Sequence, residues 1–465
     1  MLRMNDTICA PATSVGAGAI SVVRISGPEA MAAVDRVVRF RSGDAASAPG
    51  YSVKFGSVEG LDEVLVAIFR APHSYTGEDS AEISCHASPY IVSTLLDRLT
   101  EAGCRLAEPG EFTQRAFLSG KMDLAQAEAV ADVIASATSA QHRVAMNQLR
   151  GGYSAELRGL RKQLLELTAL MELELDFSEE DVEFADRSRL RELLDTACSH
   201  CRQLADSFRL GNAIRNGVPV AIVGAPNSGK STLLNALLRD DRAIVSDVPG
   251  TTRDTVEETC VIDGVLFRFI DTAGIRASSD EVEKLGIERT FRKISEAEIV
   301  LGVVDASDSP ADMEASLRTM LDKVDFEHQK MLILANKSDK TGVNKNVTAI
   351  NTFVNSTDYK KLAIEIIEIS AKAGSGLEKL RSALVERAGI ASASGTLVTN
   401  ARHAAALREA AASLSAVSDG LDRHIPSDLL AEDLRAALAS LGSITGEITT
   451  DEVLGEIFSK FCIGK

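Results

Sequence analysis

The sequence has 465 residues, 45% of them hydrophobic and 25% charged, with a formal net charge of −17. That length exceeds the ~250–300 residues at which a single hydrophobic core stops growing, so we expect a globular protein of two or three domains. No run of roughly 18 apolar residues occurs, which argues against a membrane-spanning helix, and the negative charge argues against a stand-alone, high-affinity nucleic-acid binder, because such affinity depends on Lys and Arg.

The start of the chain and its cysteines bear on location. Met1–Asp6 has no apolar run behind Arg3, so we expect no secretory or organellar leader. The seven Cys are odd in number and scattered, which is typical of reduced thiols. We therefore expect a cytoplasmic protein without a membrane segment.

The first part of the chain, to about Phe117, has a mixed α/β pattern. Strands are predicted over Ala19–Ile25 and Val64–Phe69, and a helix over Pro89–Glu101. From Leu118 to about Leu210 the composition shifts to Ala, Leu, Glu and Arg at helical spacing. The acidic stretch 172–186 interrupts this pattern and is interpreted as a solvated face or loop.

Around Val218 short apolar runs begin to alternate with helical segments. The predicted strands are Val218–Val223, Phe267–Ile270, Val300–Val304, Met331–Leu334 and Ile364–Ile369. Such alternation predicts a parallel, doubly wound sheet. The Ala-rich helical pattern returns past about Gly376, in Ala401–Leu421 and Leu429–Leu441. The pattern favours an α/β unit inserted into a helical domain whose two halves rejoin in space.

The first chemical motif is Gly224-Ala-Pro-Asn-Ser-Gly229-Lys230-Ser231, which follows an apolar strand and opens a helix predicted over Thr232–Leu238. This is the context that a phosphate-binding loop requires. Backbone N–H groups and the helix N-terminus favour phosphate there. Lys230 is expected to reach the β- and γ-phosphates, and the Ser231 hydroxyl to ligate Mg²⁺.

Further motifs follow in the order typical of guanine-nucleotide hydrolases. Asp271-Thr-Ala-Gly274 places Asp271 near Mg²⁺ and the Gly274 amide near the γ-phosphate. In Asn336-Lys-Ser-Asp339 the carboxylate can accept two hydrogen bonds from guanine, which adenine cannot supply. Ser370-Ala-Lys372 can close over the base, and Thr252 of the Gly250–Asp254 motif can offer a hydroxyl to the metal. The ordered set predicts a GTPase.

The catalytic water lacks its usual partner. Where Ras-like enzymes carry a water-orienting Gln, this chain has Ile275. Three solutions are open on the residues alone: a cation in cis from Arg253 or Arg276, a bound monovalent cation with Asn227 as a ligand, and a carboxylate at Glu281 or Glu283 that orients the water.

Several motifs together carry a resemblance that covers essentially the whole chain. They are Asp6-Thr-Ile8, Arg24-Ile-Ser-Gly27, Tyr75-Thr-Gly-Glu-Asp79, Pro109-Gly-Glu-Phe-Thr113, Lys121-Met-Asp-Leu-Ala-Gln-Ala-Glu128, the GTPase motifs, Ile444-Thr-Gly-Glu447 and Phe461-Cys-Ile-Gly-Lys465. With these motifs the sequence closely resembles the MnmE (TrmE) family of tRNA modification GTPases.

The resemblance implies a multidomain fold with an N-terminal α+β domain (1–118) related to folate-binding aminomethyltransferases. It also implies a discontinuous all-α domain (119–215 and 379–465, ending in Cys-Ile-Gly-Lys) and an inserted Ras-like P-loop G domain (216–378). Such proteins are homodimers that pair with the FAD-dependent MnmG (GidA) protein in a heterotetramer. Together they add an aminomethyl or carboxymethylaminomethyl group to C5 of the wobble uridine (U34) of tRNA. The one-carbon unit comes from a tetrahydrofolate derivative (5-formyl or 5,10-methylene).

Site residues follow from the resemblance by position. It implies folate contacts at Arg24, Glu82, Lys121 and Lys465, and K⁺ ligands at Asn227, Ser246, Val248 and Thr251. Mg²⁺ is assigned to Ser231 and Thr252, and Glu283 is preferred to Glu281 for the water. The GTP contacts are Asn227, Ser228, Gly229, Lys230, Ser231, Thr232, Ser246, Thr251, Thr252, Asp271, Thr272, Ala273, Gly274, Asn336, Lys337, Asp339 and Ser370.

The role of Cys462 stays open between a catalytic group and a packing residue. A regulatory GTPase that binds RNA or ribosomes without one-carbon chemistry is the rival hypothesis, and a folate sensor gated by GTP is a third. The N-terminal domain and Cys462–Lys465 favour the modification enzyme, because an assembly switch needs neither.

Two further patterns are interpreted as structural. Cys198-Ser-His200-Cys201 resembles half a zinc site, but it falls in a helical run predicted over Leu190–Phe208 with no second Cys/His pair, so we expect packed thiols. The C-terminal Cys-Ile-Gly-Lys fits a prenylation signal poorly.

Overall fold

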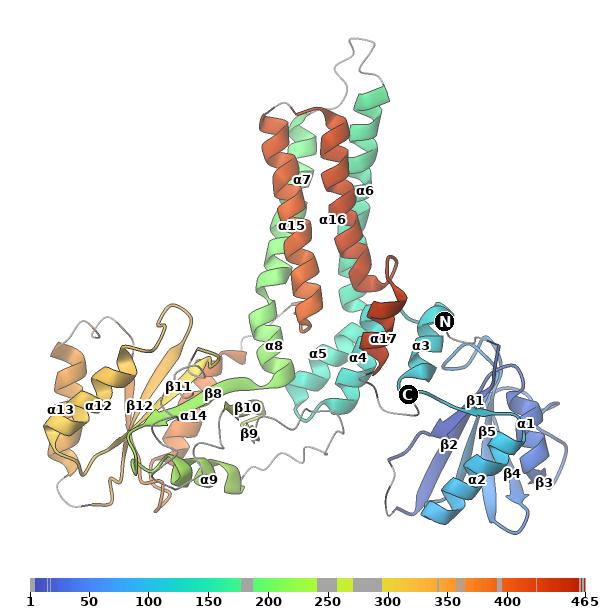
Figure 1. Ribbon diagram of the computed structural model, residues 1–465, viewed down its shortest axis with the longest axis horizontal. Coiled ribbons are helices and arrows are strands. Elements are labelled where there is room, and N and C mark those ends of the chain that lie inside the picture. Colours follow the sequence, from blue (N-terminus) through green and yellow to red (C-terminus); the bar gives the residue numbers. More distant parts are fainter. Residues whose placement is uncertain are drawn as a thin grey trace. The chain divides into compact units, whose positions relative to one another are not determined.

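The computed structural model describes residues 5–14, 16, 18–176, 187–240, 257–270, 295–340, 343–356, 359, 362, 364–390, 395–423, 425–459, 461 and 464. The chain divides into two compact units (Figure 1). The first holds Met1–Ala131, Asn147–Cys198 and Glu409–Lys465, and the second holds Asp132–Met146 and Ser199–Arg408. Among the described residues, no helix has both the length and the apolar character that a membrane crossing needs.

The first unit contains a sheet that, over the described residues, has seven strands in the order β3-β4-β5-β6-β2-β1-β7. The strands are β1 (Ile8–Pro11), β2 (Ile20–Ser26), β3 (Arg39–Phe40), β4 (Ser52–Val58), β5 (Asp62–Phe69), β6 (Ser80–His86) and β7 (Arg105–Leu106). Helices α1 (Ala30–Val37) and α2 (Pro89–Glu101) cover one face, and α3 (Glu111–Leu118) follows β7. Because side chains alternate along a strand, Val23 and Ile25 of β2 enter the core under these helices while Arg24 lies on the other face.

Long helices make up the rest of the first unit. They are α4 (Leu124–Ala135), α5 (Ser139–Leu149), α6 (Gly152–Asp176), α7 (Arg187–Asp206), α15 (Ala401–Asp422), α16 (Ser427–Thr445) and α17 (Asp451–Ser459), some of which extend into the second unit. Helix α6 packs along α16 (Figure 1). Helix α17 returns to the sheet domain, where Phe458 and Phe461 join Leu124 in a small apolar cluster.

The second unit is built on a sheet with six described strands, in the order β13-β12-β11-β8-β10-β9. Its strands are β8 (Val218–Gly224), β9 (Glu258–Ile262), β10 (Val265–Ile270), β11 (Ile299–Asp305), β12 (Lys330–Asn336) and β13 (Glu365–Glu368), and its helices are α8 (Phe208–Asn216), α9 (Lys230–Asp240), α12 (Pro310–Leu321), α13 (Val343–Ser356) and α14 (Leu377–Ala388). Alternate residues of β8 enter two different cores, Val220 one and Ala221 the other. Five of the described strands pair in parallel, and β9 pairs antiparallel with β10 at one edge. Both faces of this sheet are covered, which confirms the doubly wound prediction.

The sequence located the predicted strands of both units within a few residues of their observed bounds. The helical run predicted over Leu190–Phe208 is confirmed as far as Asp206, where α7 ends, and α8 begins two residues later at Phe208. Ser207 stands at this junction and keeps helical hydrogen bonds, because its N–H donates to the Gln203 carbonyl (3.1 Å) and its carbonyl accepts from the Gly211 N–H (2.9 Å). Its Oγ accepts a hydrogen bond from the Val398 N–H (3.0 Å), which ties the junction to a segment distant in sequence.

Candidate functional site

The predicted phosphate-binding loop lies between β8 and α9, as its sequence context requires. Two glycines permit its tight packing. A Cβ on Gly224 would lie 2.2 Å from the Val303 carbonyl oxygen, and one on Gly229 would lie 2.1 Å from Asn336 Nδ2. The loop backbone can therefore approach both the end of β11 and Asn336–Asp339, here called the guanine motif, only because Gly224 and Gly229 have no side chain.

The loop's functional side chains sit at the start of α9. Lys230 Nζ donates to the carbonyl oxygens of Gly224 (2.9 Å) and Ala225 (2.8 Å), so the ammonium is held over the loop. Ser231 and Thr232 follow in the first turn of the same helix, where the partial positive charge of its N-terminus favours phosphate. Asn227 is exposed and has a left-handed backbone (φ 59°), which Asn tolerates better than most residues.

The guanine motif is joined to this loop by Asn336, which is 2% exposed. Its Nδ2 donates to the Ser228 carbonyl (2.8 Å), and its Oδ1 accepts from the Ala371 N–H (3.0 Å). Asn336 thus fixes two motifs that are far apart in sequence. Ser370, which is fully buried, donates through Oγ to Asp339 Oδ1 (2.6 Å). That hydrogen bond lowers the pKa of Asp339 and keeps this exposed carboxylate ionised as an acceptor.

Lys337 pairs with Asp305, a residue that the sequence analysis did not identify. Its Nζ donates to the Asn227 carbonyl oxygen (2.8 Å) and to Asp305 Oδ2 (2.5 Å). Burial would raise the pKa of Asp305, but hydrogen bonds from Lys337 and Ser307 outweigh it, and the pKa is lowered. Asp305 ends β11, and the carboxyl ends of parallel strands gather at one sheet edge, so its position offered a signal.

A large part of the predicted G-domain site lies outside the described residues. These positions are Ser246, Val248, Thr251, Thr252, Arg253, Asp271, Thr272, Ala273, Gly274, Ile275, Arg276, Glu281 and Glu283. The roles given to them stay predictions.

In the first unit, two predicted folate residues lie together. Arg24 of β2 and Glu82 of β6 are direct cross-strand partners. Arg24 Nε donates to Glu82 Oε1 (2.9 Å), and its Nη2 lies 2.8 Å from the same oxygen. The Arg24 guanidinium also lies 5.3 Å from the ring centre of Tyr75 and 5.7 Å from that of Phe112. Since the side chains of Arg24 and Glu82 are 19% and 30% exposed, the pair is open to solvent on one side.

The end of the chain reaches this pair. Arg24 Nη1 donates to the Gly464 carbonyl oxygen at 3.4 Å. A Cβ on Gly464 would lie 1.9 Å from the Pro11 carbonyl oxygen, so the tail rests directly on the sheet domain. Lys121 is exposed, and its Cε would lie 3.6 Å from a Cβ built on Gly77. The remaining predicted residues of this region, Cys462 and Lys465, lie outside the described residues.

A buried ionic network underlies this site, and the sequence reasoning did not find it. Glu111 is fully buried, and its carboxylate accepts hydrogen bonds from Arg105 (2.6 Å), Arg115 (2.9 Å) and the Glu108 N–H (2.8 Å). Arg115, 1% exposed, also donates to Asp6 Oδ1 (2.6 Å). The Pro-Gly-Glu-Phe motif contains Glu111, so part of the signal was present without its partners.

Charge compensation sets the pKa values in this network. Burial would raise the pKa of Glu111, but the hydrogen bonds from Arg105, Glu108 N–H and Arg115 outweigh it and lower the pKa. The same opposition acts on Asp6, whose pKa is lowered by Arg105 and Arg115 against burial. The pKa of Arg105 is raised, first by its hydrogen bond to Glu111 and then by that to Asp6. All three groups are therefore held in their charged forms.

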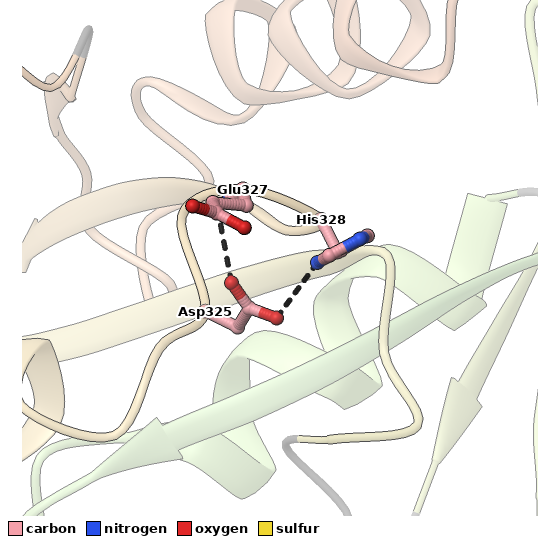
Figure 2. Close-up of side chains that lie close together, drawn as sticks. All are labelled: Asp325, Glu327 and His328. Carbon is pink, nitrogen blue, oxygen red and sulfur yellow. Dashed lines mark hydrogen bonds and ion pairs between the residues drawn. The ribbon is translucent and has the colours of Figure 1, made fainter.

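Two other polar clusters are accounted for by local structure. Asp325, Glu327 and His328 lie together and exposed in the turn before β12 (Figure 2). The Asp325 carboxylate accepts from the Glu327 N–H (3.1 Å) and meets His328 Nδ1 (2.8 Å), so it caps the turn. Cys198 and Cys201 are 7% and 0% exposed, and Cys198 Sγ donates to the Ala411 carbonyl (3.5 Å), which confirms the packed-thiol prediction.

Comparison with known proteins extends over nearly the whole chain. One family model, the MnmE helical domain, matches residues 124–462, and another, the GTP-binding protein TrmE N-terminus, matches residues 7–121. The tRNA modification GTPase MnmE of Bacteroides thetaiotaomicron is 49% identical over 469 residues, covering 99% of this chain and 100% of the relative. That of Bacteroides fragilis is 50% identical over 471 residues with the same coverage.

Among solved structures, Era in complex with MgGDPNP and nucleotides 1506–1542 of 16S ribosomal RNA is 26% identical, with a TM-score of 0.29, and covers 42% of this chain and 66% of that one. A TM-score this low adds nothing to the assignment. The full-length relatives are sufficient for the assignment. The chain belongs to the MnmE (TrmE) family of tRNA modification GTPases.

Proposed function

We propose that this GTPase couples GTP hydrolysis to modification of the wobble uridine of tRNA, adding an aminomethyl or carboxymethylaminomethyl group at C5 of U34. A tetrahydrofolate derivative, 5-formyl or 5,10-methylene, supplies the one-carbon unit. The observation that carries the proposal is the meeting of Arg24, Glu82 and the Gly464 carbonyl at one place, in a chain of this family. These residues are far apart in sequence, and a purely structural tail needs no such docking.

The chemistry of the residues fits a folate. Tetrahydrofolate has an anionic glutamate tail, which Arg24, Lys121 and Lys465 suit. Its pterin has an amide-like edge with two N–H groups, and a carboxylate such as Glu82 can accept hydrogen bonds from both. The rings of Tyr75 and Phe112 beside Arg24 supply an apolar wall. Cys462 lies two residues before Gly464, so the tail that docks at Arg24 carries this thiol as well.

In the G domain, the proposal assigns catalysis to a small set of residues. Lys230 binds the β- and γ-phosphates, and Ser231 and Thr252 hold Mg²⁺. K⁺ is bound by Asn227, Ser246, Val248 and Thr251, and Glu283 orients the attacking water in place of the missing Gln. The described members of this set, Asn227, Lys230 and Ser231, belong to one loop and the helix turn that follows it, which supports a common site.

The proposed assembly is a homodimer that joins two copies of the FAD-dependent MnmG protein in a cytoplasmic heterotetramer. A second copy of this chain suits the sheet face opposite α1 and α2. Val53 (65% exposed) and Leu65 (48% exposed) lie on that face, and Tyr51 (74% exposed) borders it. Exposed apolar side chains gathered on one face are typical of a protein interface.

The test is mass analysis of wobble nucleosides. Cells that lack this protein should lose the C5 modification, and the wild-type gene should restore it, whereas an Arg24→Ala gene should restore it poorly while its product still hydrolyses GTP. If cells without the protein keep fully modified U34, the proposal is wrong. Altered ribosome profiles with intact wobble nucleosides would instead support an assembly GTPase.

A further inference from the structure

A basic stretch in this acidic protein is not used by any site described above. From 147 to 165 the chain carries Arg150, Arg158, Arg161 and Lys162 against a single acidic residue, Glu156, although the net charge of the whole chain is −17. Such a local reversal of charge sign is the electrostatic footprint expected of a surface that binds a polyanion.

The stretch is held in place by the first turn of α4. Gln126 Nε2 donates to the Leu149 carbonyl (3.0 Å), immediately before Arg150. The neighbouring Asp123 is bonded to Gln126 through the Gln126 N–H (2.9 Å), and its Oδ2 lies 4.0 Å from Arg158 Nη1. Arg150 and Arg158 are therefore both placed around the start of α4, which begins three residues after Lys121.

Three of the four cations are available to a ligand. Arg158 is 60% exposed, and Arg150 and Lys162 are exposed and have no ion pair with another described residue. Arg161 differs, because it forms a 2.9 Å ion pair with Glu447 and so joins α6 to the end of α16. Arg158 and Lys162 are four residues apart on α6, which places them on one face, separated by ~6 Å along the helix axis.

The residues between these cations indicate the kind of ligand. Ala155 and Gly159 are exposed on the same part of α6, and a Cβ on Gly159 would meet nothing within 4 Å. Leu165 (45% exposed), three residues beyond Lys162, is the one bulky apolar side chain exposed among the described residues of α6. A single leucine does not form the continuous apolar stripe with which an amphipathic helix enters a membrane or a protein partner builds an interface core. Separate, exposed cations over a smooth backbone suit the phosphates of a nucleic-acid strand.

We propose that Arg150, Arg158 and Lys162, the α6 basic surface, bind phosphates of the tRNA backbone. The inference rests on the proposed function and adds the surface by which this chain holds its substrate. Because Arg158 lies 4.0 Å from Asp123, two residues after Lys121 in the sequence, a strand bound there can present a base toward the residues assigned to folate. Glu166, one turn beyond Lys162, marks its other end.

Charge reversal tests the surface. The variant Arg150→Glu/Arg158→Glu/Lys162→Glu is compared with Arg408→Glu/Arg423→Glu/Arg435→Glu, which reverses three exposed arginines elsewhere and changes the net charge equally. Binding of fluorescently labelled tRNA to the full-length protein is measured by anisotropy across a KCl series. The first variant should bind at least about tenfold more weakly at low salt, and the slope of log K against log [KCl] should decrease by about three. The control should stay within about twofold of wild type.

Equal affinities and slopes for the two variants, or no tRNA binding by the wild-type protein, would overturn the inference. So would a loss, in the first variant, of binding to phosphatidylglycerol vesicles with tRNA binding unchanged. GTP hydrolysis and thermal unfolding of both variants should match wild type. The proposed function fails separately, if cells lacking the protein retain modified U34. If those cells lose it and the first variant restores it fully, only the α6 basic surface is wrong.

Discussion

Glu111 shows how strongly one side chain can depend on its neighbours. It is fully buried, and three donors, from Arg105, Arg115 and the Glu108 N–H, satisfy its carboxylate. An ionised carboxylate in such a place is tolerated only because the partner charges compensate for its desolvation. Arg115 is also buried and lies one turn beyond Glu111 on the same helix. Removing the charge of Glu111 therefore leaves Arg115 without one of its carboxylate partners.

We therefore expect Glu111→Gln to lower the free energy of unfolding of the first unit by about 3 kcal/mol, the range found when one partner of a buried ion pair is removed. The matched control is Glu59→Gln, which breaks the exposed Arg39–Glu59 pair (76% and 73% exposed). That change should have an effect below about 1 kcal/mol. Urea unfolding followed by circular dichroism measures both, and equal losses would show that Glu111 is an ordinary surface-like carboxylate.

The same network predicts a pH dependence of stability. Folding lowers the pKa of Asp6 from 3.8 and that of Glu111 from 4.5. A group with a depressed folded pKa stabilises the native state above its unfolded pKa, and this contribution is lost as the pH falls through the folded pKa. Unfolding free energy should thus decrease as the pH falls below 4.5, and the decrease should be shallower in Glu111→Gln. Identical slopes in the two proteins would contradict the assignment.

Asn227 is the residue on which the proposed K⁺ site can be tested. Its backbone carbonyl is already occupied by Lys337 Nζ (2.8 Å), while its side chain is exposed at the loop. GTP hydrolysis should require K⁺, accept Rb⁺ or NH₄⁺, and proceed poorly in Na⁺. A positioned cation can supply part of the ~10³–10⁵-fold acceleration that an arginine finger provides. Asn227→Ala should remove most of the K⁺ stimulation and leave GDP affinity nearly unchanged, whereas equal turnover of the wild type in Na⁺ and K⁺ would exclude the site.

At the scale of elements, α8 is fitted closely to a segment distant in sequence. A Cβ on Gly211 would lie 2.1 Å from the Val398 carbonyl oxygen. Because that atom belongs to the backbone, it cannot move aside as a flexible side chain would. The close approach joins α8, which precedes β8, to a segment that follows α14.

Gly211→Ala should consequently destabilise the second unit by about 1–3 kcal/mol, as overpacking usually does. Gly159→Ala on α6 is the control, since its Cβ would meet nothing within 4 Å. There alanine should stabilise the protein by about 0.4–1 kcal/mol through helix propensity and lower chain entropy. Thermal unfolding of both variants gives the comparison, and a shift of the same sign in both would refute the packing argument.

The elements that sequence patterns located are those with strong local signals. Strands β8, β11 and β12 are apolar on both faces, because helices cover both, and α2 begins with proline in its first turn. In the first unit β3 and β7 have two residues each, too few to show any periodicity. Strands β1, β4 and β6 of that unit and β9 of the second were not predicted either, because they mix apolar with polar residues, and their place depends on pairing partners.

The candidate sites likewise differ in how far their signals are local in the sequence. The phosphate loop is local in sequence, so its motif sufficed. Arg24 and Glu82 are 58 residues apart, and Asp6 and Arg115 are 109 apart, so residue spacing alone gives no reason to join them. The family resemblance supplied the first pair by position. The pairing of Asp6 with Arg115 was not predicted, because a buried ionic network leaves no periodic pattern in the sequence.

At the scale of the whole chain, residues near its two ends are in contact. Residue 464 meets the sheet at Pro11, and its carbonyl accepts a hydrogen bond from Arg24, 440 residues earlier. Phe461 reinforces the docking, since it packs in one cluster with Leu124 and Phe458. The first unit can therefore be completed only after the second unit and the last helices have been synthesised.

Gly464 gives a direct test of this arrangement. Its φ of 92° disfavours any other residue, and an added Cβ would lie 1.9 Å from the Pro11 carbonyl oxygen. Gly464→Ala should displace the Gly464 carbonyl from Arg24, and Lys465, the predicted folate contact that follows it in the sequence, would be shifted as well. Affinity for 5-formyltetrahydrofolate, measured by calorimetry on the full-length protein, should fall, because the site loses a cation that suits the anionic tail of the ligand.

Gly455→Ala, at an exposed position within α17 where a Cβ meets nothing within 4 Å, is the matched control and should leave folate affinity unchanged. GTP hydrolysis should be normal in both variants, since the phosphate loop belongs to the other unit. If Gly464→Ala binds folate as tightly as wild type, the docked tail belongs to the architecture of the chain and not to the folate site.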